Sequence, residues 1–276
     1  MSKIKFKIPL NPSANKIDIS SKIQKEYPIA VDEQKASITD LSEYINDPYL
    51  GINSFKMICK TESGRRRLID TLSINHCENW QQNMVPAEYV RKMSNLVKNA
   101  DQYIVYFSLE FLESLIFEYR NNPDKIIFMG DNKYELQLAK SVYGVHTILF
   151  TKDIYNEYGL KYLVTKLKEK VNNMKFDNFA VIGNPPYQEE ANLSGGGAQK
   201  PLYHKFIEYT IDYLKPNYIS FIIPSRWMVG GLGLSEFRNR IMNDKRMKDI
   251  IHISDARKIF NSVDIKGGIQ YFLYRI

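Results

Sequence analysis

Cysteine, histidine, tryptophan and long apolar runs are all scarce in this chain of 276 residues. Its two cysteines, Cys59 and Cys77, cannot build a disulfide framework and are too few for a structural zinc site. No apolar run approaches the roughly 18–20 residues that cross a bilayer, and the start MSKIKFKIPL lacks the long apolar segment of a secretion signal. We therefore expect a cytoplasmic protein with no metal centre and no membrane partner.

The charge balance is the first positive feature. With 38 basic and 31 acidic residues the net charge is +7, which suits a polyanionic partner such as nucleic acid. A lysine-rich composition alone gives the same balance, so the charge does not decide between these two interpretations. The hydrophobic share of 44% is ordinary for a soluble globular protein.

The chain divides by its periodicity at about residue 80. Residues 1–80 are polar and weakly periodic, and we expect an N-terminal extension of unknown role there. From there to residue 276 short apolar strands alternate with amphipathic helices. The predicted strands are 103–108, 125–130, 146–150, 178–183, 218–224, 248–254 and 269–276; the predicted helices are 86–97, 109–120, 132–144, 159–174, 200–214 and 234–244.

This alternation predicts an α/β fold with a doubly wound, mostly parallel seven-stranded sheet covered by helices on both faces. Such sheets bind ligands beyond the carboxyl ends of their strands, at the point where the strand order reverses. Candidate site residues should therefore follow the strands directly.

The sharpest signal of this kind is the run Gly183-Asn184-Pro185-Pro186-Tyr187, which ends the fourth strand. Prolines have no backbone N–H, so carbonyl oxygens in this turn remain available as acceptors. The Asn184 side chain and a neighbouring carbonyl could accept both hydrogens of an exocyclic amine, and Tyr187 could stack on the planar base that carries it. A proline-braced turn without a function is the alternative.

The segment VIGNPPYQ resembles motif IV of the amino-methyltransferases that use S-adenosylmethionine, in the Asn-Pro-Pro-Tyr form typical of N6-adenine methyltransferases. Further along, PSRWM and GLGLSEFR resemble restriction–modification methylases in which nuclease and methylase share one chain. The resemblance covers about residues 80–276. It implies a class I methyltransferase domain over 81–276, with Asn184, Pro185, Pro186 and Tyr187 as catalytic residues and no metal.

The resemblance also implies a set of cofactor-binding residues. NMVPAEYVRKMSNLV resembles motif X, with Pro86 in place and Val85 where the family usually has Thr. Asp131 follows the second strand, where the family's ribose-binding acid stands, and Asp153 lies in a motif III-like segment. The first strand should end in a glycine-rich turn, but no glycine lies between Asp101 and Gly130.

Two interpretations of this missing glycine turn stay open. Either Phe107, Ser108 and Glu110 bind the cofactor in its place, or the chain is a DNA-binding subunit or fragment without cofactor. Lys200 and Arg226 could contact phosphates, or could be a helix-start lysine and an arginine with a buried stem.

The expected function is site-specific methylation of adenine N6 in double-stranded DNA, and the methylase part of a type II restriction–modification system is one setting for it. In this motif order a target-recognition domain follows the core, and no segment for it is apparent. Three alternatives stay open: the chain is a truncated piece, a separate specificity or nuclease subunit reads the DNA, or residues 1–80 do so. Methylation of RNA or of a protein glutamine is the enzymatic alternative, because Asn-Pro-Pro-Tyr also serves a side-chain amide.

Overall fold

The computed structural model describes residues 85–131, 135–136, 139–149, 157–189, 200–231, 233–260 and 265–276. Two compact units divide the chain, one made of residues 1–83 and 137–144, the other of residues 84–136 and 145–276. The second unit contains the whole sheet. Residues 1–80 and Asp153 lie outside the described part of the chain, as does the glycine run 195–197.

One seven-stranded sheet forms the centre of this unit, with the strand order β3-β2-β1-β4-β5-β7-β6. The strands are β1 (Gln102–Tyr106), β2 (Ile126–Gly130), β3 (His146–Leu149), β4 (Phe179–Gly183), β5 (Tyr218–Pro224), β6 (Met247–Ile253) and β7 (Ile269–Arg275). β1 to β5 pair in parallel, whereas β7 is antiparallel to both β5 and β6. The predicted mostly parallel seven-stranded α/β sheet is therefore confirmed.

The order of the strands places the reversal point between β1 and β4. From β1 the sheet continues through β2 to β3 on one side and through β4 to β5 on the other. Tyr106 is paired with Gly183 at the last position of the two strands. The carboxyl ends of β1 and β4 therefore meet where a doubly wound sheet binds its ligand.

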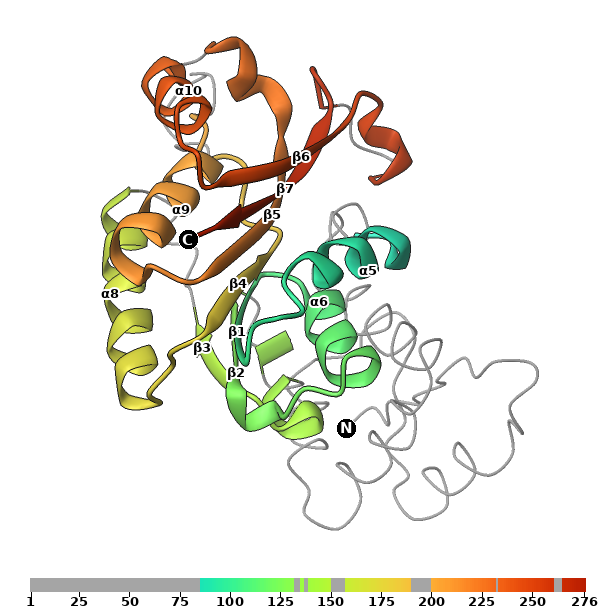
Figure 1. Cartoon of the computed structure of the whole chain (residues 1–276), viewed down its shortest axis with the longest axis vertical. Helices are drawn as coiled ribbons and strands as arrows, with labels where there is room; N and C mark the ends of the chain where they lie inside the picture. The colour runs from blue at the N-terminus through green and yellow to red at the C-terminus, as the bar shows by residue number, and fades with distance from the viewer. Residues whose placement is uncertain are drawn as a thin grey trace, which may run out of the picture. The chain divides into compact units, whose positions relative to one another are not determined.

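Helices cover both faces of the sheet, with α5 and α6 on one side and α8 and α9 on the other (Figure 1). The longer helical segments are α5 (Ala87–Leu96), α6 (Leu109–Glu113) continued by the π-turn η2 (Ser114–Glu118), α8 (Glu157–Asn173), α9 (Tyr203–Tyr209) continued by η6 (Thr210–Leu214), and α10 (Ser235–Met242). Short turns are η3 (Pro123–Lys125), η7 (Ser225–Val229) and η8 (Ala256–Lys258), and η4 (Ala139–Tyr143) belongs to the other unit.

The helix expected over 200–214 begins three residues later than predicted, at Tyr203. The preceding segment is in an extended pairing instead: Pro201 forms an isolated bridge with Gln188, and the Leu202 N–H donates to the Tyr187 carbonyl oxygen at 2.9 Å. This non-local pairing replaces the first helical turn and attaches the segment to the Asn-Pro-Pro-Tyr loop.

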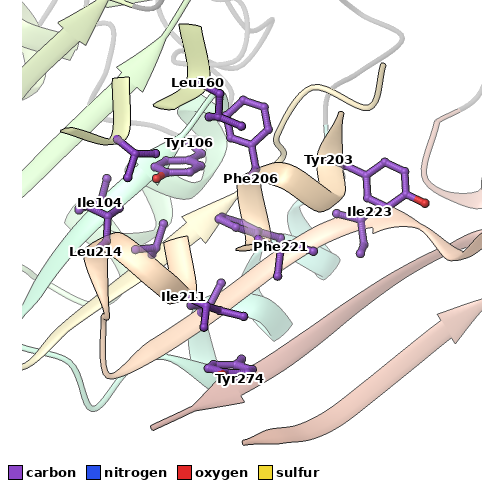
Figure 2. Packing of buried hydrophobic residues seen from close by; sticks show 14 of the residues in the cluster. Ile104, Tyr106, Leu160, Tyr203, Phe206, Ile211, Leu214, Phe221, Ile223 and Tyr274 are labelled. Carbon is purple, nitrogen blue, oxygen red and sulfur yellow. The ribbon is translucent and has the colours of Figure 1, made fainter. Parts of the chain in front are cut away.

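The core between the sheet and α8, α9 and η6 is rich in aromatic rings (Figure 2). Tyr106 lies at its centre, stacked on Phe221 with ring centroids 5.2 Å apart and edge-on to Phe206 at 6.0 Å. Its hydroxyl lies 3.4 Å from Thr210 Oγ1. Because Tyr106 is fully buried and ends β1, the core fixes the strand end on which the site is built.

Candidate active site

Gly183 is the residue that allows β1 and β4 to approach closely at their ends. It has a positive φ of 154°, and a Cβ there would overlap the Tyr106 carbonyl oxygen and lie 2.8 Å from the Tyr106 nitrogen. Glycine is the only residue without that Cβ. The following residue, Asn184, donates its backbone N–H to the same Tyr106 carbonyl at 3.0 Å. The Asn-Pro-Pro-Tyr loop thus starts from a fixed position against β1.

The far end of the Asn-Pro-Pro-Tyr loop is fixed as well. Besides the bond from Leu202 to Tyr187, the Glu189 N–H donates to the Lys200 carbonyl oxygen at 2.9 Å. Pro185 is buried, whereas Asn184, Pro186 and Tyr187 are half-buried. The structure therefore brings the four predicted catalytic residues together in one loop, bonded at both ends, at the reversal point of the sheet. Their catalytic role stays a prediction.

Tyr187 lies among aromatic rings from two distant parts of the chain. Its ring is edge-on to Tyr203 of α9 and to Phe260, each with centroids 6.4 Å apart. Its hydroxyl is buried and finds no hydrogen-bond partner among the described residues, and burial raises its pKa. Tyr187 therefore remains a neutral ring at any physiological pH, which suits contact with an uncharged planar group.

Phe260 was not among the residues expected at the site. It follows η8, in the segment DARKIF between β6 and β7, and it is almost fully buried. The one signal in the sequence was that Phe260 follows a predicted strand. That signal was not sufficient, because the position of β6 in the sheet was not evident from the sequence. The fold alone places this ring beside Tyr187.

Tyr203 interacts both with Tyr187 and with the turn after β5, which carries Arg226. Burial raises the pKa of the Tyr203 hydroxyl, while the Trp227 backbone N–H and the charge of Arg226 act in the opposite direction. Figure 2 shows Tyr203 over Ile223 of β5, with its hydroxyl directed away from the core. Arg226 is exposed, whereas the Tyr203 hydroxyl on which its charge acts is buried.

The turn after β1 has a left-handed backbone conformation that glycine usually adopts, although no glycine is present there. Phe107 has a φ of 57°, in the left-handed region that bulky residues rarely enter. Its N–H donates to the Met129 carbonyl oxygen at 2.7 Å, and its ring is edge-on to Phe206 at 5.6 Å. Packing of the ring and this hydrogen bond hold a backbone conformation that glycine would adopt without strain.

Ser108 and Glu110 bond to each other behind this turn. Ser108 Oγ donates to Glu110 Oε2 at 2.6 Å, and the Val85 N–H donates to Glu110 Oε1 at 3.1 Å. Ser108 and Glu110 are both 4% exposed. The buried carboxylate therefore joins the turn after β1 to the start of α5, next to Pro86. A direct contact of these two side chains with a cofactor stays a prediction.

Asp131 directly follows β2, one strand away from the Phe107 turn, and is half-buried. Pro86 is the N-cap residue of α5 and is also half-buried.

Among the residues that the structure describes, no three His, Cys, Asp or Glu side chains come close enough together to hold a metal ion. Within the same residues, no helix is long and apolar enough to span a membrane.

The sequence model of the Eco57I restriction-modification methylase family matches residues 25–260, which is most of the chain. The chain belongs to this family. The match begins within the segment 1–80 and includes the whole Asn-Pro-Pro-Tyr loop. The predicted membership in the restriction–modification methylases is thereby confirmed.

A relative of known sequence agrees with this family. An "Uncharacterized adenine-specific methylase" of Mycoplasma pneumoniae is 32% identical over 153 residues, which cover 54% of this chain and 34% of that protein. The chain thus spans about a third of the length of this curated relative.

Among solved structures, a chain from a study of complex assembly and conformational transition of the type I R-M system aligns with a TM-score of 0.55 and 12% identity, over 81% of this chain and 47% of that one. An O-methyltransferase from Bacillus cereus aligns over 86% of this chain and 97% of its own with a TM-score of 0.44 and 8% identity. At such low identity the first similarity shows a shared fold and nothing more.

The methyl donor of this family is S-adenosylmethionine, and the strand ends fit such a nucleoside. A half-buried carboxylate follows β2, where a ribose can donate its hydroxyls. The left-handed turn at Phe107 ends the neighbouring strand and shapes the backbone as a glycine would. This chain thus departs from the family pattern in having the Phe107 side chain at this turn. The backbone of Phe107 nevertheless has a conformation typical of glycine.

Proposed function

We propose that this chain methylates the N6 amine of adenine in double-stranded DNA, with S-adenosylmethionine as the methyl donor, as part of a restriction–modification system. The observation that carries the proposal is the Asn-Pro-Pro-Tyr loop, fixed at both ends and placed against the end of β1 by Gly183. The family membership and the net charge of +7 support DNA as the substrate.

The role of the loop follows from its acceptors. Asn184 Oδ1 and the Pro185 carbonyl oxygen accept the two amine hydrogens of the adenine, which leaves the nitrogen lone pair directed toward the end of β1. The bound cofactor would supply an electrophilic methyl group there: the carbon–sulfur bond breaks as the carbon–N6 bond forms, the sulfonium becomes a neutral thioether, and the methylated amine releases one proton to solvent. Catalysis by these residues consists of positioning and of stabilising the positive charge that develops on the amine.

Tyr187 holds the adenine by its ring. Base-flipping enzymes stack the extruded base on aromatic side chains, because a duplex hides the N6 amine inside the base stack. The buried Phe260 ring packs edge-on against Tyr187 and supports the position of the Tyr187 ring. Asp131 binds the cofactor's ribose. Glu110 holds the turn after Phe107 and the start of α5 together through its bonds to Ser108 and Val85.

The experiment is methyl transfer from radiolabelled S-adenosylmethionine to DNA isolated from a host without adenine methylation. The wild-type chain should label this DNA, and Asn184→Ala should lose the activity while binding S-adenosylmethionine with unchanged affinity in calorimetric titration. Full labelling by Asn184→Ala would exclude the assigned mechanism. Label appearing in RNA or in a protein glutamine instead would exclude DNA as the substrate.

The non-enzymatic alternative is a DNA-binding subunit without cofactor. It predicts no heat of binding for S-adenosylmethionine even when DNA is present. Partners are part of the proposal: since the chain spans about a third of its curated relative, we expect a specificity or nuclease subunit, or further segments of a longer protein, to read the recognition sequence.

A further inference from the structure

An apolar side chain projects into solvent directly after β5, at the edge of the sheet that carries the site. Val229 ends the turn η7 and is 82% exposed. Among the described residues the next most exposed large apolar side chains, Tyr162 and Met242, are each 58% exposed. Single exposed apolar residues are common, so the way in which this one is held decides whether it has a function.

The turn that carries Val229 is fixed from both sides. Trp227 is 1% exposed and packs edge-on against Phe237 of α10, with centroids 5.4 Å apart. Arg238 Nε donates to the Met228 carbonyl oxygen at 2.6 Å, and Ser235 Oγ donates to the Gly230 carbonyl oxygen at 2.9 Å. Val229 is therefore presented outward by a braced turn and not by a loose loop.

The turn that carries Val229 also carries one exposed cation, and a second follows in the neighbouring turn. Arg226 and Lys266 are both exposed. Gly267, the neighbour of Lys266, has a φ of 89°, and a Cβ on it would lie 4.0 Å from the Arg226 Cα. Two turns from different parts of the chain thus bring the backbone of Arg226 close to that of Gly267, the neighbour of Lys266. This arrangement suits a phosphate group.

The same turn is close to the candidate base pocket. Ser225, its first residue, donates its N–H to the Gly268 carbonyl oxygen at 3.0 Å. The charge of Arg226 acts on the Tyr203 hydroxyl, and the Tyr203 ring contacts Tyr187. The turn and the Asn-Pro-Pro-Tyr loop thus both lie near Tyr203.

We propose that the turn Ser225–Val229 is a wedge that enters the DNA duplex beside the flipped adenine: Val229 occupies apolar space between the bases, and Arg226 with Lys266 binds the adjoining phosphate. Apolar wedges between base steps stabilise opened or kinked duplexes, because they replace lost stacking. This inference rests on the proposed methylation of DNA and assigns to it the element that keeps the base out of the stack.

The phosphate contact is tested by the salt dependence of binding to a fluorescent duplex. Each phosphate contact contributes about 0.9 to the slope of log K against log salt concentration. Arg226→Gln should lower this slope by about one. The control Lys168→Gln, an exposed lysine in the last turns of α8, should leave it unchanged. An unchanged slope in Arg226→Gln would overturn the phosphate contact.

The wedge is tested with 2-aminopurine in place of the target adenine, whose fluorescence rises when it leaves the base stack. The target position is found by sequencing DNA that the wild-type chain has methylated. Val229→Ser should lower the fluorescence gain and the kcat of methyl transfer at least tenfold. Val229→Leu, which keeps an apolar side chain, should show both at the wild-type level. Met242→Ser, an equally apolar change at the end of α10, should behave as the wild type.

The outcomes separate the two proposals. If the wild-type chain methylates DNA but Val229→Ser flips the base as well as the wild type does, the wedge is wrong and the function stands. If the wild-type chain binds S-adenosylmethionine but methylates no DNA, both proposals are wrong. Unchanged S-adenosylmethionine affinity in Val229→Ser shows that any loss in that variant arises on the DNA side.

Discussion

Gly183 and Tyr106 touch through their backbones at the ends of β4 and β1, with no room for a side chain between them. The contact aligns two functions that come from different parts of the sequence. β1 leads to the turn proposed to bind the cofactor, and β4 leads to the loop proposed to hold the amine. The distance between the turn after β1 and the loop after β4 is fixed by Gly183 and by the hydrogen bond from the Asn184 N–H to the Tyr106 carbonyl oxygen.

Gly183→Ala should therefore separate the two strand ends. The added Cβ overlaps the Tyr106 carbonyl, and we expect a loss of about 2–4 kcal/mol in the free energy of unfolding and of nearly all methyl transfer. Urea unfolding measures the first and labelled methyl incorporation the second. Gly231→Ala is the stability control, because an added Cβ there would lie 4.0 Å from the Arg226 Nε, an ordinary van der Waals contact. Equal stability of the two variants would contradict the steric argument.

Tyr187→Phe should leave activity within about threefold of the wild type and raise the free energy of unfolding by about 1 kcal/mol. Its buried hydroxyl has no hydrogen-bond partner in the described part of the chain, so the change removes an unsatisfied group. Tyr187→Ala should lower activity about 10–100-fold, since stacking on an aromatic ring contributes about 1–3 kcal/mol per base. If Tyr187→Phe is as inactive as Tyr187→Ala, the hydroxyl has a role that the ring does not.

Glu110→Gln should destabilise the protein by about 1–3 kcal/mol, because one of the two carboxylate acceptors becomes a donor and loses its partner. Either the Val85 N–H or the Ser108 hydroxyl then remains buried without an acceptor. Glu88→Gln, which removes only an exposed ion pair with Lys92, should cost less than about 0.5 kcal/mol. Thermal unfolding compares the two variants, and equal melting temperatures would contradict the bridging role of Glu110.

Asp244 should make stability depend on pH below about pH 4. Its carboxylate accepts from Arg246 at 2.8 Å and from the Tyr274 hydroxyl at 2.9 Å, and the Arg246 guanidinium is the main cause that lowers its pKa to about 2. A lowered folded-state pKa contributes stability above the unfolded-state pKa near 3.8, and this stability is lost as the pH falls toward 2.

Asp244→Asn should therefore lose about 1 kcal/mol at neutral pH, since solvent screens the exposed Arg246 partner. The stability of this variant should also change less than that of the wild type between pH 4 and 2. Urea titrations across this range measure the effect. Asp255→Asn is the matched control: Asp255 also pairs with an arginine, Arg257, but both side chains are well exposed. A wild-type stability that does not change between pH 4 and 2 would contradict the assignment.

Much of the architecture could be predicted because its signals are local. Short apolar runs bounded by turn residues predicted seven strands, and β5 has the predicted bounds of residues 218–224. The insertion of β7 between β5 and β6 was not evident, since strand order depends on pairing between distant segments. The boundary at residue 80 and the roles of Pro86, Asp131 and Asp153 stay predictions.

The sequence by itself determined which chemical groups the Asn-Pro-Pro-Tyr loop carries. Asn184, two prolines and Tyr187 are adjacent in the chain, and two prolines at a strand end dictate a rigid turn. Only the tertiary structure decided what surrounds that turn. Phe260 reaches Tyr187 through the order of β6 and β7, Glu110 bonds to Val85 across the start of α5, and packing against Phe206 holds Phe107 in a glycine-like conformation. Each of these contacts joins segments far apart in the chain, and no local pattern of residues specifies them.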